Sequence, residues 1–130
     1  TLFFGNYDDA TRRLCYANCG HNPPVLLRGD GAMERLTATA TVLGLFEDWN
    51  CLVEEVALSP GDTLVVFSDG VTEARSDDGE FFGDARLLET FWTNRHLAVP
   101  SLLRAIVTTV QQFSGREQED DLTLVVARAR

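Results

Sequence analysis

The stretch that decides the fold reads Leu64-Val65-Val66-Phe67-Ser68-Asp69-Gly70-Val71-Thr72-Glu73. Its first four residues form a continuous apolar run, which is typical of a buried strand, and the Ser-Asp-Gly that follows favours a turn. The strand therefore delivers the carboxylate of Asp69 to an edge of a sheet. Taken alone, Asp69 is equally well interpreted as a helix N-cap or a turn residue.

A second acidic group stands where another apolar strand begins. Glu119-Asp120-Asp121 leads directly into Leu122-Thr123-Leu124-Val125-Val126-Ala127. Two buried strands that run in opposite directions would bring Asp69 and Asp120 to one rim, where partly desolvated carboxylates repel each other unless a cation neutralises them. The pattern predicts a divalent metal that prefers oxygen ligands. Alone, the acidic run would be interpreted as a loop in solvent, as most such runs are.

Composition and charge limit the class of protein. The chain has 130 residues, of which 45% are hydrophobic and 24% charged, and this composition predicts one globular domain. A formal charge of -9 argues against nucleic acid as a partner. No apolar run approaches the roughly 20 residues that span a bilayer, and the first residues lack the basic flank of a signal peptide. Three cysteines without a signal peptide indicate reduced thiols, so we expect a soluble, cytoplasmic protein.

Turn residues divide the chain into short elements. We expect two hairpins, formed by residues 2–7 with 13–18 and by 25–28 with 33–36, followed by strands at 51–58 and 63–68. Two helices should follow, the first with Asp84 as its N-cap and the second opened by Pro100. A strand at residues 122–127 closes the chain. The strands and helices do not alternate as βαβ units would. The α+β class with mostly antiparallel sheets is therefore favoured over a parallel doubly wound sheet.

Other chemistries fit the sequence less well. A zinc site could be imagined from Cys15, Cys19, His21 and Cys51, but the spacing matches no usual structural zinc motif. We interpret the cysteines as small core residues and His21 as a loop residue whose imidazole bonds the backbone. The acidic run at residues 76–80 lacks the ligand pattern of a calcium loop and is interpreted as a surface turn. No glycine-rich phosphate loop or Gly-x-Ser-x-Gly elbow is present.

Five motifs resemble one known family, the PPM-type metal-dependent serine/threonine phosphatases in their bacterial SpoIIE/RsbU-like branch. In family order along the whole chain they are TLFFG (1–5), YANCGHNPP (16–24), GDTLVVFSDGVTEA (61–74), GEFFG (79–83) and DDLTLVV (120–126). Cys19 departs from the pattern, since the family usually has Ala there. Asn22 stands where the family usually has Pro.

The resemblance implies a fold and a metal centre. The fold is a four-layer α-β-β-α sandwich with two Mn²⁺ or Mg²⁺ ions at one end of two packed sheets. Asp69 and Asp120 match metal ligands of the family. Asp121, where relatives often carry Asn, and Ser68 would support the site, and Gly70 has no side chain to crowd water at the metals.

The implied activity is hydrolysis of phosphoserine or phosphothreonine, with two metals activating water so that no phosphoenzyme is needed. The implied substrate is a regulatory phosphoprotein of bacterial partner-switching signalling, such as an anti-sigma factor antagonist, and a sensor or regulatory domain is expected upstream. Two alternatives stay open: a non-catalytic phosphatase-like module that binds a protein partner, and a structural metal-binding domain.

The family's N-terminal half has no match in this chain. Residues 1–130 are therefore expected to be the C-terminal portion of one phosphatase domain, without the aspartate that bridges both metals. We expect weak metal binding and little activity from this portion alone. We also expect uncovered apolar sheet surface that favours a homodimer or strand exchange.

Overall fold

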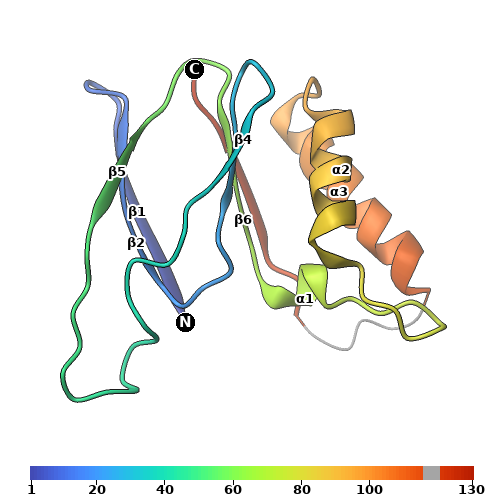
Figure 1. Ribbon diagram of the computed structural model, residues 1–130. Helices are drawn as coiled ribbons and strands as arrows, with labels where there is room; N and C mark the ends of the chain where they lie inside the picture. Colours follow the sequence, from blue (N-terminus) through green and yellow to red (C-terminus); the bar gives the residue numbers. More distant parts are fainter. Residues whose placement is uncertain (116–120) are drawn as a thin grey trace. The chain divides into compact units, whose positions relative to one another are not determined.

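Two units make up the structure, a computed structural model that describes residues 1–115 and 121–130 (Figure 1). One unit contains residues 1–65 with 128–130, and the other contains residues 66–127.

A three-stranded antiparallel sheet begins the first unit. Its strands are β1 (Leu2–Asp8), β2 (Arg13–Cys19) and β5 (Glu54–Ala57), in the order β1-β2-β5. Because side chains alternate along a strand, Leu14 and Tyr16 face the same side, and both are buried with Leu36. Phe3 stacks on Tyr16 with 5.8 Å between the ring centroids. The first expected hairpin is confirmed.

The second expected hairpin is also present, as β3 (Val25–Leu27) and β4 (Met33–Arg35). The Asp30 carboxylate accepts the Ala32 N–H at 2.9 Å, so the turn is stabilised by its own side chain. On its other edge β3 pairs antiparallel with β6 (Thr63–Phe67), with Val25 opposite Val65. The strand order is β4-β3-β6-β7.

The strand expected at residues 51–58 is shorter than predicted. β5 begins only at Glu54, because another segment occupies the edge of β2 beyond Tyr16. The N–H groups of Thr39 and Ala40 donate to the Asn18 carbonyl at 2.8 and 3.1 Å. These bonds take the positions that residues 51–53 would need to continue the strand.

The second unit carries the helices α1 (Asp69–Thr72), α2 (Gly83–Asn94) and α3 (Val99–Ser114) and most of the strand β7 (Leu124–Arg128). The apolar stripe predicted for α3 is confirmed, since Leu102, Ile106 and Val110 are buried. Pro100 lies in the first turn, and Gly115 ends the helix in the left-handed conformation.

Two details of the predicted helices were wrong. Asp84 is not the N-cap of α2, because the helix begins one residue earlier, at Gly83. Asp84 instead lies in the first turn, where a negative charge interacts favourably with the helix dipole. The short helix α1 was not predicted. Its four residues are too few to show an apolar period.

β7 runs antiparallel to β6. At one end, main-chain bonds link Gly61 and Asp62 to Ala129, and at the other end Ser68 N–H donates to the Thr123 carbonyl at 3.0 Å. In Figure 1 the strand β6 continues directly into α1. The α+β class with antiparallel sheets is confirmed. None of the helices within residues 1–115 and 121–130 is long and apolar enough to cross a membrane.

Candidate metal-binding site

Asp69 stands where β6 ends and α1 begins. The strand is anchored by Val65 and Phe67, which are 0% and 1% exposed, whereas the Asp69 side chain is exposed. The main-chain N–H of Gly70 donates to Asp69 Oδ1 at 3.0 Å. A carboxylate offers about four acceptor positions, so this bond leaves capacity for a cation. The structure places Asp69 at the end of β6, as predicted, whereas its role as a metal ligand stays a prediction.

Ser68 joins the end of β6 to the start of β7. Its hydroxyl donates to the Asp121 carbonyl at 3.1 Å and accepts the Thr123 N–H at 3.0 Å. Together with the bond from Ser68 N–H to the Thr123 carbonyl, these contacts fix the two strand ends side by side. The residue that precedes Asp69 thus contacts the backbone of Asp121, at the edge where the sequence predicts the second acid.

Asp120 itself lies outside the described residues, so its role as a metal ligand stays a prediction. Asp121 is described and its side chain is exposed. The contact between Asp121 and Ser68 runs through the main-chain carbonyl of Asp121. The supporting role of the Asp121 side chain stays a prediction.

Gly70 is buried directly behind Asp69, and Val71 beside it is 0% exposed. α1 is therefore fixed against the interior of its unit at the residues that follow the carboxylate. The Glu73 N–H also donates to the Asp69 carbonyl at 2.8 Å, which closes the turn. This packing holds the Asp69 main chain in one position while its carboxylate faces solvent.

The donor chemistry at this edge suits a hard divalent cation. Carboxylate oxygens are the ligands that Mg²⁺ and Mn²⁺ prefer. Within residues 1–115 and 121–130, however, no three His, Cys, Asp or Glu side chains gather in a way that could hold a metal. The described residues therefore offer the type of ligand that such an ion prefers, but they do not supply a full ligand set.

The four residues of the zinc alternative do not lie together as a metal site. Cys19 Sγ lies 4.0 Å from Cys51 Sγ, whereas Cys15 Sγ contacts Glu55 Oε2 at 3.5 Å. All three cysteines are free thiols. The bond found for His21 comes from its main-chain N–H, which donates to Asn18 Oδ1 at 2.9 Å, rather than from the imidazole that we expected to bond the backbone.

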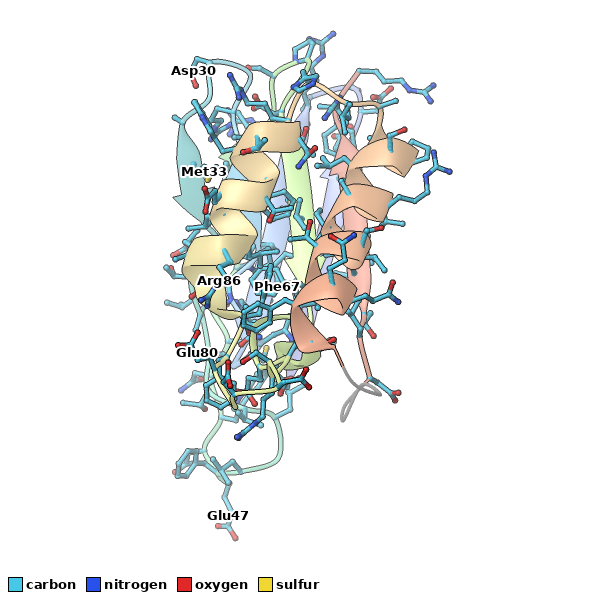
Figure 2. The ribbon with its side chains drawn as sticks, turned by 90° about the vertical axis from the view of Figure 1, so that its right-hand side faces the viewer. Asp30, Met33, Glu47, Phe67, Glu80 and Arg86 are labelled. Carbon is cyan, nitrogen blue, oxygen red and sulfur yellow. The ribbon has the colours of Figure 1, made fainter. Side chains whose placement is uncertain are left out.

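The acidic run at residues 76–80 is a turn, as predicted. Gly79 N–H donates to the Ser76 carbonyl at 2.9 Å, and Ser76 N–H donates to the Glu80 carbonyl at 2.9 Å. Glu80 pairs on the surface with Arg86 at 3.2 Å, and Figure 2 labels both residues near each other. Glu80 thus connects this turn to α2.

Asn18 is a buried polar residue that the sequence motifs did not single out. Its side chain is 0% exposed, donates to the Leu36 carbonyl at 3.1 Å and accepts the His21 N–H. A signal was available, because Asn18 shares the buried face of β2 with Leu14 and Tyr16. A polar residue on an apolar face must find hydrogen bonds, and here it shapes the loop that follows the strand.

The chain belongs to the SpoIIE family. The family described as "Stage II sporulation protein E (SpoIIE)" matches residues 1–130, the whole sequence. The resemblance inferred from the five motifs is thereby confirmed.

Relatives and solved structures agree with this assignment. The chain is 34% identical to "Protein IcfG" of Synechocystis sp. over 125 residues, which are 96% of this chain and 20% of that protein. It is 29% identical to "Phosphoserine phosphatase RsbU" of Bacillus subtilis over 131 residues, covering 100% of this chain and 39% of that protein. The phosphatase domain of SpoIIE from Bacillus subtilis, presoaked with Mn, superposes with a TM-score of 0.77 at 22% identity, over 99% of this chain and 56% of that one.

The structural similarity shows that the chain shares the fold of part of that phosphatase domain. The chain spans well under half the length of these two relatives, at 20% and 39%.

Proposed function

We propose that this chain forms part of the catalytic domain of a Mn²⁺- or Mg²⁺-dependent protein serine/threonine phosphatase, with Asp69 and Asp120 as metal ligands. One observation carries the proposal. The Ser68 hydroxyl binds the start of β7 to the end of β6 through Asp121 and Thr123, at the edge that presents Asp69.

The comparisons support the reaction type. The chain belongs to the SpoIIE family, RsbU is named a phosphoserine phosphatase, and the SpoIIE phosphatase domain was studied after soaking with Mn. We propose that the substrate of the present protein is a phosphoserine or phosphothreonine on a regulatory protein, of the anti-sigma factor antagonist type. An upstream sensor or regulatory domain would control the phosphatase.

The residues of this chain would contribute position and charge. When bound, two divalent ions supply an activated water and neutralise charge on the phosphoryl group. Asp69 would bind an ion through its carboxylate, in which the Gly70 N–H occupies only one acceptor position. The bonds of Ser68 to β7 would hold Asp69 at a fixed distance from the residues that open that strand. Pre-positioned ligands lose little entropy when the ions bind.

The test is Asp69→Asn in the full-length protein. Removing the carboxylate charge should lower Mn²⁺-dependent hydrolysis of a phosphoserine peptide by at least about 100-fold, because the remaining ligands cannot replace an anionic ligand of the ion. Melting without metal should be unchanged or slightly higher, since one like charge is removed from the edge. Asp9→Asn, at an exposed position in the β1–β2 turn, is the matched control and should keep the wild-type rate.

Hydrolysis near the wild-type rate in Asp69→Asn would contradict the assignment. If the wild-type full-length protein itself hydrolyses no phosphopeptide with Mn²⁺ or Mg²⁺ and still binds a protein partner, the non-catalytic module replaces the phosphatase. Metal-dependent melting without turnover or partner binding would indicate a structural metal domain.

A further inference from the structure

Two thiols meet at the far end of β2. Cys19 is the last residue of the strand and is 2% exposed, and Cys51 is half-buried. Their sulfur atoms lie 4.0 Å apart, although 32 positions separate the residues in sequence. Sulfur atoms in a disulfide are about 2.05 Å apart, so a bond requires them to approach by roughly 2 Å.

Strand register explains the meeting. In the pairing of β2 with β5, Cys15 lies opposite Glu55 and Tyr16 opposite Glu54. Continuing the same antiparallel register past the end of β5 sets Cys51 opposite Cys19. The backbone of Ala40 forms a bridge with Cys19 at that position, so the segment around Cys51 cannot pair with β2 as a strand. The side chains of Cys19 and Cys51 nevertheless meet, as the register predicts.

Cys51 lies near the end of residues 37–53, a segment between β4 and β5 that belongs to no strand or helix. The segment exposes Leu45 and Phe46, which are 65% and 58% exposed, and Figure 2 shows Glu47 at its outer tip. Its two ends are joined by a bond of 3.3 Å from Leu52 N–H to the Thr39 carbonyl. Cys51 lies in irregular chain, whereas Cys19 is fixed in the sheet. The movement that brings the sulfurs together can therefore come from Cys51.

We propose that Cys19 and Cys51 form a reversible disulfide when the protein meets a low-molecular-weight disulfide, and that this bond fastens the 37–53 segment to β2. The thiolate of Cys51, the more exposed residue, attacks the small disulfide, forms a mixed disulfide and releases one small thiolate. The thiolate of Cys19 then attacks the Cys51 sulfur and expels the second small thiolate. The two protons lost by the cysteines end on the two released thiols, so two protein thiols are oxidised while one small disulfide is reduced.

The order of attack follows from burial. Burial raises the pKa of the Cys19 thiol, and the hydrogen bond with Cys51 raises it further. A buried thiol with a raised pKa is a slow first nucleophile, because the thiolate is the reactive form. Once Cys51 carries the mixed disulfide, its proximity replaces the need for a low pKa at Cys19.

Cys15 is excluded as the partner of Cys19. The two residues lie on the same extended strand four positions apart, which is roughly 13 Å and too far for a bond. Cys15 also contacts Glu55, the residue opposite it in the register. It is therefore the matched control.

The experiment treats the full-length protein with oxidised glutathione and maps its peptides by mass spectrometry after alkylation. The expected product is a peptide that links Cys19 to Cys51, with Cys15 still alkylated, and dithiothreitol should reverse the link. Cys51→Ser should abolish it and Cys15→Ser should leave it unchanged. A stable glutathione adduct on Cys51 with Cys19 still alkylated, or a link from Cys51 to Cys15, would overturn the proposal.

Hydrogen exchange measures the fastening. Amide exchange in peptides from residues 37–53 should slow several-fold on oxidation, because the bond closes a loop whose opening exposes those amides. The same treatment of Cys51→Ser should leave exchange there unaltered. Equal exchange in the oxidised and reduced wild-type protein would show that the bond does not fasten the segment.

Discussion

At the scale of single residues, Asp62 is a charged side chain in a buried position. Its side chain is 2% exposed, and it accepts the N–H groups of Ser59 and Gly29 at 2.9 Å each and an Arg28 guanidinium N–H at 2.8 Å. A carboxylate out of water is costly unless such donors compensate it. Asp62 is thereby the connection between the β3–β4 hairpin and the turn that leads into β6.

We predict that Asp62→Ala lowers the free energy of unfolding by about 2–3 kcal/mol, because three donors lose their acceptor at a buried position. Urea denaturation measures the change. Glu34→Gln is the matched control, since Glu34 pairs with the same Arg28 at 2.8 Å but is 48% exposed. It should cost no more than about 1 kcal/mol. Equal losses in the two variants would contradict the importance given to burial.

The pH dependence of stability should report the same carboxylate. Burial alone would raise the pKa of Asp62, but the bonds from Ser59, Arg28 and Gly29 outweigh it and hold the pKa below its ordinary value of 3.8. A folded-state pKa below the unfolded one gives stability that is present above pH 3.8 and lost as the pH falls through the folded-state value. The difference in unfolding free energy between wild type and Asp62→Asn should therefore shrink on acidification from about pH 5 to about pH 2.5. A difference that stays constant over this range would show that Asp62 does not titrate with a lowered pKa.

Asp69 and Asp62 differ in how far the sequence predicts their positions. The position of Asp69 at the end of β6 was predictable, because an acid directly after an apolar run is visible in the sequence. Asp62 precedes its strand within Ser-Pro-Gly-Asp, where turn chemistry explains it equally well. Its importance comes from Arg28 and Gly29, which only the folded chain brings near.

At the scale of elements, the end of β2 depends on a close approach between Gly20 and Val42. Gly20 has φ of +72°, and a Cβ added there would lie 2.6 Å from Val42 Cγ2. Gly79 has a similar φ of +82°, but a Cβ there would meet nothing within 4 Å. The two glycines therefore separate the backbone cost of a side chain from its steric cost.

We predict that Gly20→Ala destabilises the protein by about 2–4 kcal/mol and Gly79→Ala by about 1–2 kcal/mol, the cost of a left-handed L-residue. Thermal and urea unfolding measure both. Val42→Ala removes the methyl group that clashes, so in that background Gly20→Ala should cost no more than Gly79→Ala. An unchanged cost in the double variant would mean that the contact with Val42 is not what selects glycine.

Elements were predictable where a local pattern determines them. The stripe of Leu102, Ile106 and Val110 repeats with the helical period and defined α3. The apolar run before Ser68 likewise defined β6. The start of β5 was not predictable, because it depends on Thr39 and Ala40 reaching the Asn18 carbonyl from a distant part of the sequence.

At the scale of the whole molecule, several large apolar side chains are exposed. Phe4, Leu52 and Val53 are 61%, 69% and 69% exposed. The homodimer expected from such a surface stays a prediction.

The fold class was predictable from the order of elements. The number of metal ligands was not predictable, because ligands come from segments that are distant in the sequence.

Residues 1–130 alone and the full-length protein should differ in metal binding and in activity. Mn²⁺ takes about six oxygen ligands, and the proposed site draws two carboxylates, Asp69 and Asp120, from this chain. We therefore expect residues 1–130 alone to bind Mn²⁺ only weakly, with a Kd on the order of 1 mM, and to hydrolyse no phosphoserine peptide. The full-length protein should bind at least about tenfold more tightly and turn over substrate, as isothermal titration and phosphate release would measure. Comparable Mn²⁺-dependent hydrolysis by the two proteins would mean that residues 1–130 complete the site themselves, and the missing ligands would then have to be sought among this chain's own acids.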